Sequence, residues 1–164
     1  MPVVRRLQGF DVTLQYFDPY PLTREKEQEL GVQRVSLEEL FRSSDIITCH
    51  TPLTPETRHV VNQKSLALMK PTAILINTSR GSIVDEAALV AALQEGRIAG
   101  AGLDVFETEP AEKGNPLLAM DNVVFTAHNA GTTFDTWCRR AEFCYQNMQR
   151  VLEGQPPQAI AQEY

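Results

Sequence analysis

Cysteine is scarce in this chain of 164 residues. Its three cysteines, Cys49, Cys138 and Cys144, form no C-x-x-C pair and have no histidine at metal-ligand spacing. An odd and widely spaced set of this kind excludes a disulfide framework and gives no support for a zinc site. We therefore interpret the cysteines as reduced packing residues and expect no metal.

Long apolar runs and an excess of positive charge are also missing. No stretch approaches the roughly 18 to 20 apolar residues of a membrane span, and the opening MPVVRRLQGF has no apolar segment typical of a secretory signal. Fifteen basic residues against 21 acidic ones give a formal net charge of −6, so no basic surface for nucleic acid or anionic lipid is expected. We predict a cytoplasmic protein with no nucleic-acid and no membrane partner.

The sequence does contain a regular alternation of strand and helix patterns, with 43% hydrophobic residues. Strand patterns lie at 11–17, 32–35, 45–49, 72–77, 99–105 and 123–126. Helix patterns lie at 3–7, which Gly9 would close, and at 23–30, 36–42, 62–69, 85–93 and 133–152. This alternation predicts an α/β fold, a Rossmann-like doubly wound parallel sheet.

In such a sheet a ligand binds beyond the carboxyl ends of the strands. Asp18 follows the first predicted strand, where an acidic side chain accepts hydrogen bonds from ribose hydroxyls and favours NAD over NADP. Arg80 follows the most apolar strand, where its guanidinium could grip a substrate carboxylate in two parallel hydrogen bonds. The alternatives are a plain Asp-Pro turn at Asp18 and a solvated arginine before a turn glycine at Arg80.

His128 ends a later strand and is the candidate acid and base. A carboxylate beside a histidine favours the charged ring and fixes its tautomer, and Glu109 could supply that carboxylate. The alternative is a strand-end histidine that bonds only to backbone. We interpret His50 and His59 as structural, and Trp137 as an anchor for a missing or partner surface.

Five segments carry a family resemblance: YFDPY (16–20), HTPLTPETRHVVN (50–62), NTSRGSIVDEAAL (77–89), AGLDVFETEP (101–110) and TAHNAGTT (126–133). Their order and spacing resemble the NAD-dependent D-2-hydroxyacid dehydrogenases, including the D-3-phosphoglycerate dehydrogenases, as far as about Leu152. The resemblance implies reversible hydride transfer between nicotinamide and C2 of a D-2-hydroxyacid or 2-oxoacid. It also implies a homodimer.

The same resemblance assigns roles to particular residues. Arg80 would bind the substrate carboxylate and carbonyl, His128 would donate and accept the proton, and Glu109 would orient His128. Glutamate here, where formate dehydrogenases have glutamine, favours a hydroxyacid or oxoacid. Asp18 would hold the adenosine ribose and Asp104 the nicotinamide carboxamide. The other implied NAD contacts are Thr51, Thr78, Ser79, Arg80, His128, Asn129, Ala130 and Gly131.

The sequence departs from the family in one respect, because no G-x-G-x-x-G occurs and Gly100-Ala101-Gly102 is only a fragment of one. The resemblance places the first strand, the glycine loop and part of the substrate domain upstream of Met1. We therefore expect an N-terminally truncated, single partial NAD-binding domain over 1–164: a sheet with helices at 1–132, a long helix at 133–152 and a tail at 153–164. Weak cofactor binding, exposed strand edges and exposed apolar faces would follow. The alternatives are a non-catalytic NAD-sensing or dimerisation module and a non-functional fragment.

Overall fold

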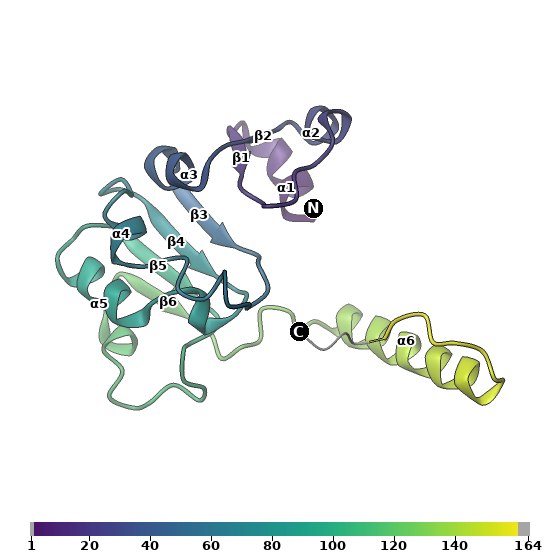
Figure 1. The fold of residues 1–164 in the computed structure, drawn as a ribbon. Helices are drawn as coiled ribbons and strands as arrows, with labels where there is room; N and C mark the ends of the chain where they lie inside the picture. The colour runs from purple at the N-terminus through teal and green to yellow at the C-terminus, as the bar shows by residue number, and fades with distance from the viewer. Residues whose placement is uncertain (1, 161–164) are drawn as a thin grey trace.

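The computed structural model describes residues 2–160, whose strands are all parallel and form two sheets (Figure 1). Strands β1 (Leu14–Tyr16) and β2 (Val32–Arg34) form one sheet. The other holds, in chain order, β3 (Ile46–Cys49), β4 (Ile74–Asn77), β5 (Gly100–Leu103) and β6 (Val123–Phe125). The α/β class with parallel strands is confirmed. Met1 and residues 161–164 of the predicted tail lie outside the described residues.

Helices alternate with these strands, as predicted. The α-helices are α1 (Pro2–Leu7), α2 (Arg24–Leu30), α3 (Leu37–Ser43), α4 (Gln63–Leu66), α5 (Glu86–Gln94) and α6 (Phe134–Leu152). Three short 3-10 helices, which sequence patterns did not predict, are η1 (Gln8–Phe10), η2 (Gly81–Ile83) and η3 (Pro116–Ala119). The helix starts follow from capping, since the side chains of Thr23, Ser36, Asp85 and Thr133 each accept a backbone N–H of the first turn.

The first segment differs from its prediction. Gly9 does not close the helix, because the chain continues as η1 and turns at Asp11, whose φ of 55° is left-handed. Asp tolerates this conformation better than most residues, and the turn takes up the start of the expected strand. Strand β1 is therefore limited to Leu14–Tyr16.

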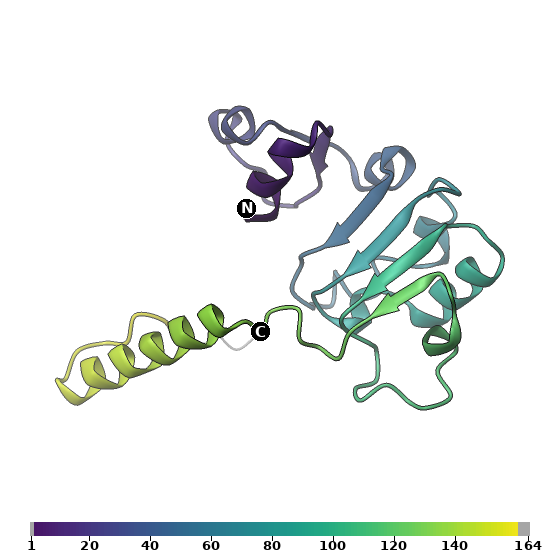
Figure 2. The same ribbon diagram turned by 180° about the vertical axis from the view of Figure 1, so that it is seen from behind.

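The core lies on one face of the four-stranded sheet. The register aligns Ile47, Leu75, Ala101 and Val123 in one row across all four strands, and each is buried. Helices α4 and α5 cover this face, and the core also takes in Leu117 of η3 (Figures 1 and 2). Burial of this row fixes the register, because a shift by one residue would turn it outward.

The opposite face of the same sheet is open. Ile46, Ile74 and Val124 point to it and are 60%, 39% and 74% exposed. Within residues 2–160 the strands thus form two sheets, and the larger one is covered on one face, which agrees with the expectation of exposed strand edges and exposed apolar faces. The edges of β1 and β3 bear no strand partner there, and the two sheets are linked through Gln15, whose Nε2 donates to the hydroxyls of Ser43 (2.8 Å) and Ser44 (2.9 Å).

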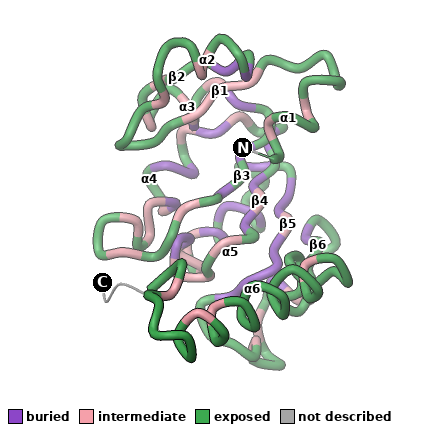
Figure 3. Tube along the Cα trace, turned by 90° about the vertical axis from the view of Figure 1, so that its right-hand side faces the viewer, coloured by how far each residue is buried: buried purple, intermediate pink, exposed green. Residues whose placement is uncertain are grey.

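Helix α6 extends away from both sheets, and none of its residues is buried (Figures 1 and 3). Trp137 on this helix is 59% exposed. The prediction that all three cysteines pack in the interior is wrong for two of them. Cys49 of β3 is buried, but Cys138 and Cys144 lie exposed on α6, because that helix packs against neither sheet.

Candidate active site

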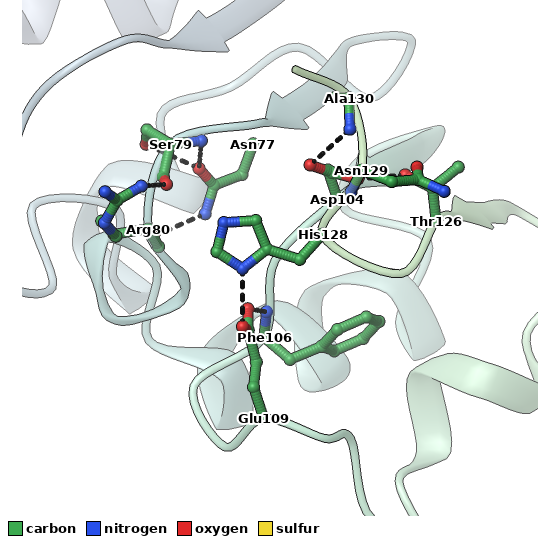
Figure 4. A network of polar contacts seen from close by, with 10 residues as sticks. All are labelled: Asn77, Ser79, Arg80, Asp104, Phe106, Glu109, Thr126, His128, Asn129 and Ala130. Atoms are coloured by element: carbon green, nitrogen blue, oxygen red, sulfur yellow. Dashed lines mark hydrogen bonds and ion pairs between the residues drawn. The ribbon is translucent and has the colours of Figure 1, made fainter. Parts of the chain in front are cut away.

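The loops that follow β4, β5 and β6 meet at the carboxyl edge of the four-stranded sheet (Figure 4). The loop after β4 carries Arg80, the loop after β5 carries Asp104 and Glu109, and the loop after β6 carries His128. These four residues, although far apart in the sequence, therefore share one site, because parallel strands end on the same side of a sheet.

Glu109 and His128 form a hydrogen-bonded pair. Nδ1 of His128 lies 2.7 Å from Oε2 of Glu109, and Oε1 of Glu109 accepts the backbone N–H of Phe106 at 3.0 Å. The hydrogen bond with His128 holds the pKa of the Glu109 carboxyl below its ordinary value, although partial burial opposes the shift. Nε2 of the ring points away from Glu109, toward the side on which Asn77 and Arg80 lie (Figure 4). This ring atom is therefore the one available to a reacting group.

Asp104 organises the loop that carries His128. Its Oδ1 accepts the Thr126 hydroxyl and the Asn129 N–H (2.8 Å), and its Oδ2 accepts the Ala130 N–H (3.0 Å). Burial of Asp104, which is 4% exposed, raises its pKa, but these hydrogen bonds outweigh burial and lower the pKa overall. A carboxylate has about four acceptor positions, so one remains free on Oδ2.

The backbone at His128 is left-handed, with φ at 51°. Such a conformation is uncommon outside glycine and persists where surrounding contacts determine it. Here the N–H of His128 donates to the carbonyl of Asp104 at 2.8 Å, while the two following N–H groups donate to its carboxylate. Sequence reasoning missed this role of Asp104, since it depends on three backbone groups 25 residues away.

Asn77 builds the loop that presents Arg80. It is 1% exposed, its Nδ2 donates to the Arg80 carbonyl (3.0 Å), and its Oδ1 accepts the N–H (3.1 Å) and hydroxyl (2.8 Å) of Ser79. The Arg80 side chain is exposed, and Nη1 donates to the Ser79 carbonyl at 2.6 Å. The guanidinium therefore stands at the site with most of its donors free for an anion.

Gly81 is a second position that sequence reasoning did not assign to the site. A Cβ placed there would lie 1.8 Å from the carbonyl oxygen of Phe106. The loop with Arg80 and the loop with Glu109 therefore touch through their backbones. An R-G dipeptide after a buried strand is the only sequence signal for this close approach.

The remaining predicted NAD residues are spread more widely. Asp18 lies after β1, in the other sheet, with its Oδ1 accepting the Tyr20 N–H at 2.8 Å in a turn and its carboxylate otherwise exposed. Beside it is an open groove of about 810 Å³ whose lining is mixed, with apolar and charged side chains: Phe17, Pro21, Leu22, Arg24, Glu27, Arg34, Val35 and Ser36. Thr51 is partly exposed with its hydroxyl on the Pro52 carbonyl (3.3 Å), while Thr78 and Gly131 are exposed at the site edge.

Among residues 2–160, no group of three or more His, Cys, Asp or Glu side chains is arranged to hold a metal ion. A search of the same residues finds no helix with the length and apolar character needed to span a membrane.

Comparison with known proteins identifies the family. The family model described as the NAD binding domain of D-isomer specific 2-hydroxyacid dehydrogenase matches residues 1–130. The chain belongs to this family. A glyoxylate reductase of Korarchaeum cryptofilum is 47% identical over 163 residues, which are 98% of this chain and 48% of that relative. The chain thus spans about half the length of such relatives.

Solved structures agree with this assignment. The apo D-mandelate dehydrogenase of Rhodotorula graminis superposes with a TM-score of 0.89 at 35% identity, covering 98% of this chain and 47% of that one. A D-isomer specific 2-hydroxyacid dehydrogenase from Lactobacillus delbrueckii in its NAD complex gives 0.86 at 29% identity, covering 97% and 52%. The predicted family, Rossmann-like fold and NAD cofactor are confirmed.

The residues present fit NAD at both of its ends. The unpaired acceptor position on Asp104 Oδ2 suits an amide N–H such as that of a carboxamide. At the other end, the exposed carboxylate of Asp18 has acceptor positions that suit the hydroxyl groups of a ribose.

Proposed function

We propose that this chain carries the hydride-transfer site of an NAD-dependent dehydrogenase acting on a D-2-hydroxyacid or the matching 2-oxoacid. The observation that supports this most is the 2.7 Å contact between Glu109 and His128, with Nε2 of the ring turned toward the side of Arg80. A carboxylate, an imidazole and a guanidinium at one edge of a parallel sheet supply a proton donor and an anion binder.

The reaction divides among these side chains as follows. Arg80 binds the carboxylate of a 2-oxoacid and stabilises negative charge that develops on the carbonyl oxygen. His128 delivers a proton from Nε2 to that oxygen, which completes the hydroxyl group. Glu109 accepts the Nδ1–H, so the ring keeps the orientation in which Nε2 faces the substrate. Bound NADH would supply the hydride to C2.

Other side chains would hold the cofactor. Asp104 offers its free acceptor position to the carboxamide, and Asp18 offers its exposed carboxylate to the adenosine ribose. We assign contacts along the cofactor to the remaining predicted residues, which are Thr51, Thr78, Ser79, Asn129, Ala130 and Gly131. Because the 164 residues contain no G-x-G-x-x-G loop to hold a pyrophosphate, this chain binds NADH weakly by itself. Titration of NADH fluorescence tests this, and submicromolar binding would contradict it.

The activity has a direct test. Purified chain is assayed for oxidation of NADH with glyoxylate, hydroxypyruvate or pyruvate. We expect His128→Ala to abolish turnover and Arg80→Ala to raise KM, while His50→Ala, a change at a histidine outside the site, leaves both parameters unchanged. Turnover that survives His128→Ala would refute the proposed acid and base.

We also propose that the chain forms a homodimer through α6. Nine apolar residues lie on one stripe of this helix, and six of them follow strict alternating steps of four and three: Phe134, Cys138, Ala141, Tyr145, Met148 and Leu152. This spacing is typical of a helix that pairs with another helix. This stripe is the observation that favours the alternative function of a dimerisation module.

A further inference from the structure

A second histidine–carboxylate pair lies next to the site, between His59 and Glu107. Nε2 of His59 is 2.5 Å from Oε1 of Glu107, and the two side chains are 37% and 28% exposed. The pair joins the loop between β3 and α4 to the loop after β5, which are 48 residues apart in sequence. Sequence analysis gave His59 only a structural role.

The backbone of His59 is anchored beside the Arg80 loop. Its N–H donates to the Ser82 carbonyl at 2.8 Å, and its carbonyl accepts Nδ2 of Asn62 at 2.9 Å. A parallel bridge between Val61 and Val84 continues the contact. His59 has a φ of 52°, an uncommon left-handed value that these contacts determine. His59 is therefore anchored through its backbone to the segment directly after Arg80 and Gly81.

Glu107 is held from the other side by the start of α5. The N–H of Glu86 donates to Oε2 of Glu107 (3.3 Å), and the N–H of Glu107 donates to Oε2 of Glu86 (3.0 Å). Asn115 donates to the other carboxylate oxygen of Glu86 at 2.5 Å. The carboxylates of Glu86 and Glu107 thus each accept a backbone N–H of the other residue, and the imidazole of His59 bonds to the remaining oxygen of Glu107.

These contacts form a continuous chain of hydrogen bonds beside the site. From His59 it runs through Glu107 to the adjoining Phe106, whose N–H holds Glu109, and Glu109 holds His128. In the other direction it runs from His59 through Ser82 to the loop of Arg80. The backbone contact at Gly81 lets the two loops touch, and the bond from His59 to Glu107 adds a hydrogen-bonded connection between them through the His59 segment, which is anchored at Ser82.

We propose that His59 and Glu107 are positioning residues that clamp the loop carrying Glu109 against the loop carrying Arg80 and so keep the ring of His128 hydrogen-bonded to Glu109. This inference rests on the proposed function, because it concerns the distance between the anion-binding Arg80 and the proton donor His128. The competing account is an ordinary partly exposed pair, which contributes little.

The test reads the His128 ring directly by NMR on the full chain without cofactor. The measured quantities are the ring 15N shifts and the exchange rate of the Nδ1 proton with water, with His128 assigned from its loss in His128→Ala. His59→Leu removes the donor to Glu107, and we expect about tenfold faster exchange of the His128 proton, since the loop opens more often. His59→Gln places an amide donor near the position of Nε2 and should restore slow exchange.

Lys70→Gln is the matched control. It breaks a more exposed ion pair with Asp45 (2.8 Å), at the opposite end of the strands, and should leave the ring of His128 unchanged. If His59→Leu behaves like Lys70→Gln, the clamp does not exist. Should His59→Leu fail to fold, the exchange of the His128 proton is measured in Glu107→Gln instead. This change weakens the same hydrogen bond and keeps the size of the side chain. An unchanged exchange rate in Glu107→Gln overturns the proposal. A wild-type chain without turnover would refute the proposed function but would leave this comparison intact.

Discussion

Asp104 is the residue on which the geometry of the His128 loop depends most. Asp104→Asn keeps the size of the side chain, but either amide orientation sets its NH2 group against a backbone N–H, of Asn129 or of Ala130. We expect a loss of about 1–3 kcal/mol in the free energy of unfolding, because a buried donor is left unsatisfied. Urea unfolding followed by circular dichroism measures it. Asp45→Asn, a change at an exposed carboxylate, should cost under about 0.5 kcal/mol, and equal losses would contradict this role.

The lowered pKa values at the site predict a dependence of stability on pH. A carboxyl with a folded pKa below its ordinary value contributes stability that is fully present above the ordinary value and is lost as pH falls through the folded one. Asp104 and Glu109, with ordinary values of 3.8 and 4.5, both shift in this direction. The unfolding free energy should therefore be flat above about pH 5 and fall below it. Asp104→Asn should fall less steeply in acid, and parallel curves for variant and wild type would exclude its contribution.

Gly81 carries the sharpest steric prediction. In Gly81→Ala the new Cβ would meet the Phe106 carbonyl at 1.8 Å, and backbone on both sides cannot turn away as a side chain can. We expect a loss of about 3 kcal/mol or more in stability. Gly114→Ala, where nothing lies within 4 Å, is the control and should change stability by less than about 0.5 kcal/mol. A Gly81→Ala chain as stable as the control would mean that the two loops are not in contact.

At the scale of single elements, burial rather than residue type decides what a strand contributes. Leu75 of β4 is fully buried, whereas Ile46 of β3 is 60% exposed on the open face. We expect Leu75→Ala to cost about 2–5 kcal/mol through lost burial and a cavity, and Ile46→Ala to cost under about 1 kcal/mol. Denaturant unfolding of both variants compares them. A large loss for Ile46→Ala would show that something covers that face in solution.

Much of the element order was predictable from sequence, because caps and apolar periodicity are local. The segments 36–42, 85–93 and 133–152 form helices, with ends within one residue of those predicted. Contacts such as Gly81 with Phe106 were not predictable, since they depend on how distant loops meet. The left-handed backbone at Asp11 was missed for another reason: the sequence offers Gly9 as the better candidate, and the chain uses the aspartate.

At the scale of the whole molecule, predicted site residues lie in two parts. Arg80, Glu109 and His128 are assembled on the four-stranded sheet, as strand-end reasoning anticipates, but Asp18 belongs to the separate sheet of β1 and β2. Strand patterns identify the strands but not how they pair, because pairing depends on neighbouring strands; the unpaired edges were expected from the family resemblance instead, which places a strand upstream of Met1. The open face of the four-stranded sheet and the exposed helix α6 have one feature in common. Each is an amphipathic element whose apolar side meets nothing within the described chain.

The exposed stripe of α6 gives the last prediction, which concerns association. Met148 lies in the stripe and is 58% exposed, so Met148→Glu should leave the fold unchanged while placing a charge in the seam between two paired helices. Analytical ultracentrifugation should find a dimer for the wild type and a monomer for this variant, because a charge buried between helices is costly. Gln146→Glu adds the same charge on the polar side and should remain dimeric. A wild-type chain that stays monomeric at every concentration, or a Met148→Glu dimer as tight as that of Gln146→Glu, would exclude α6 as the interface.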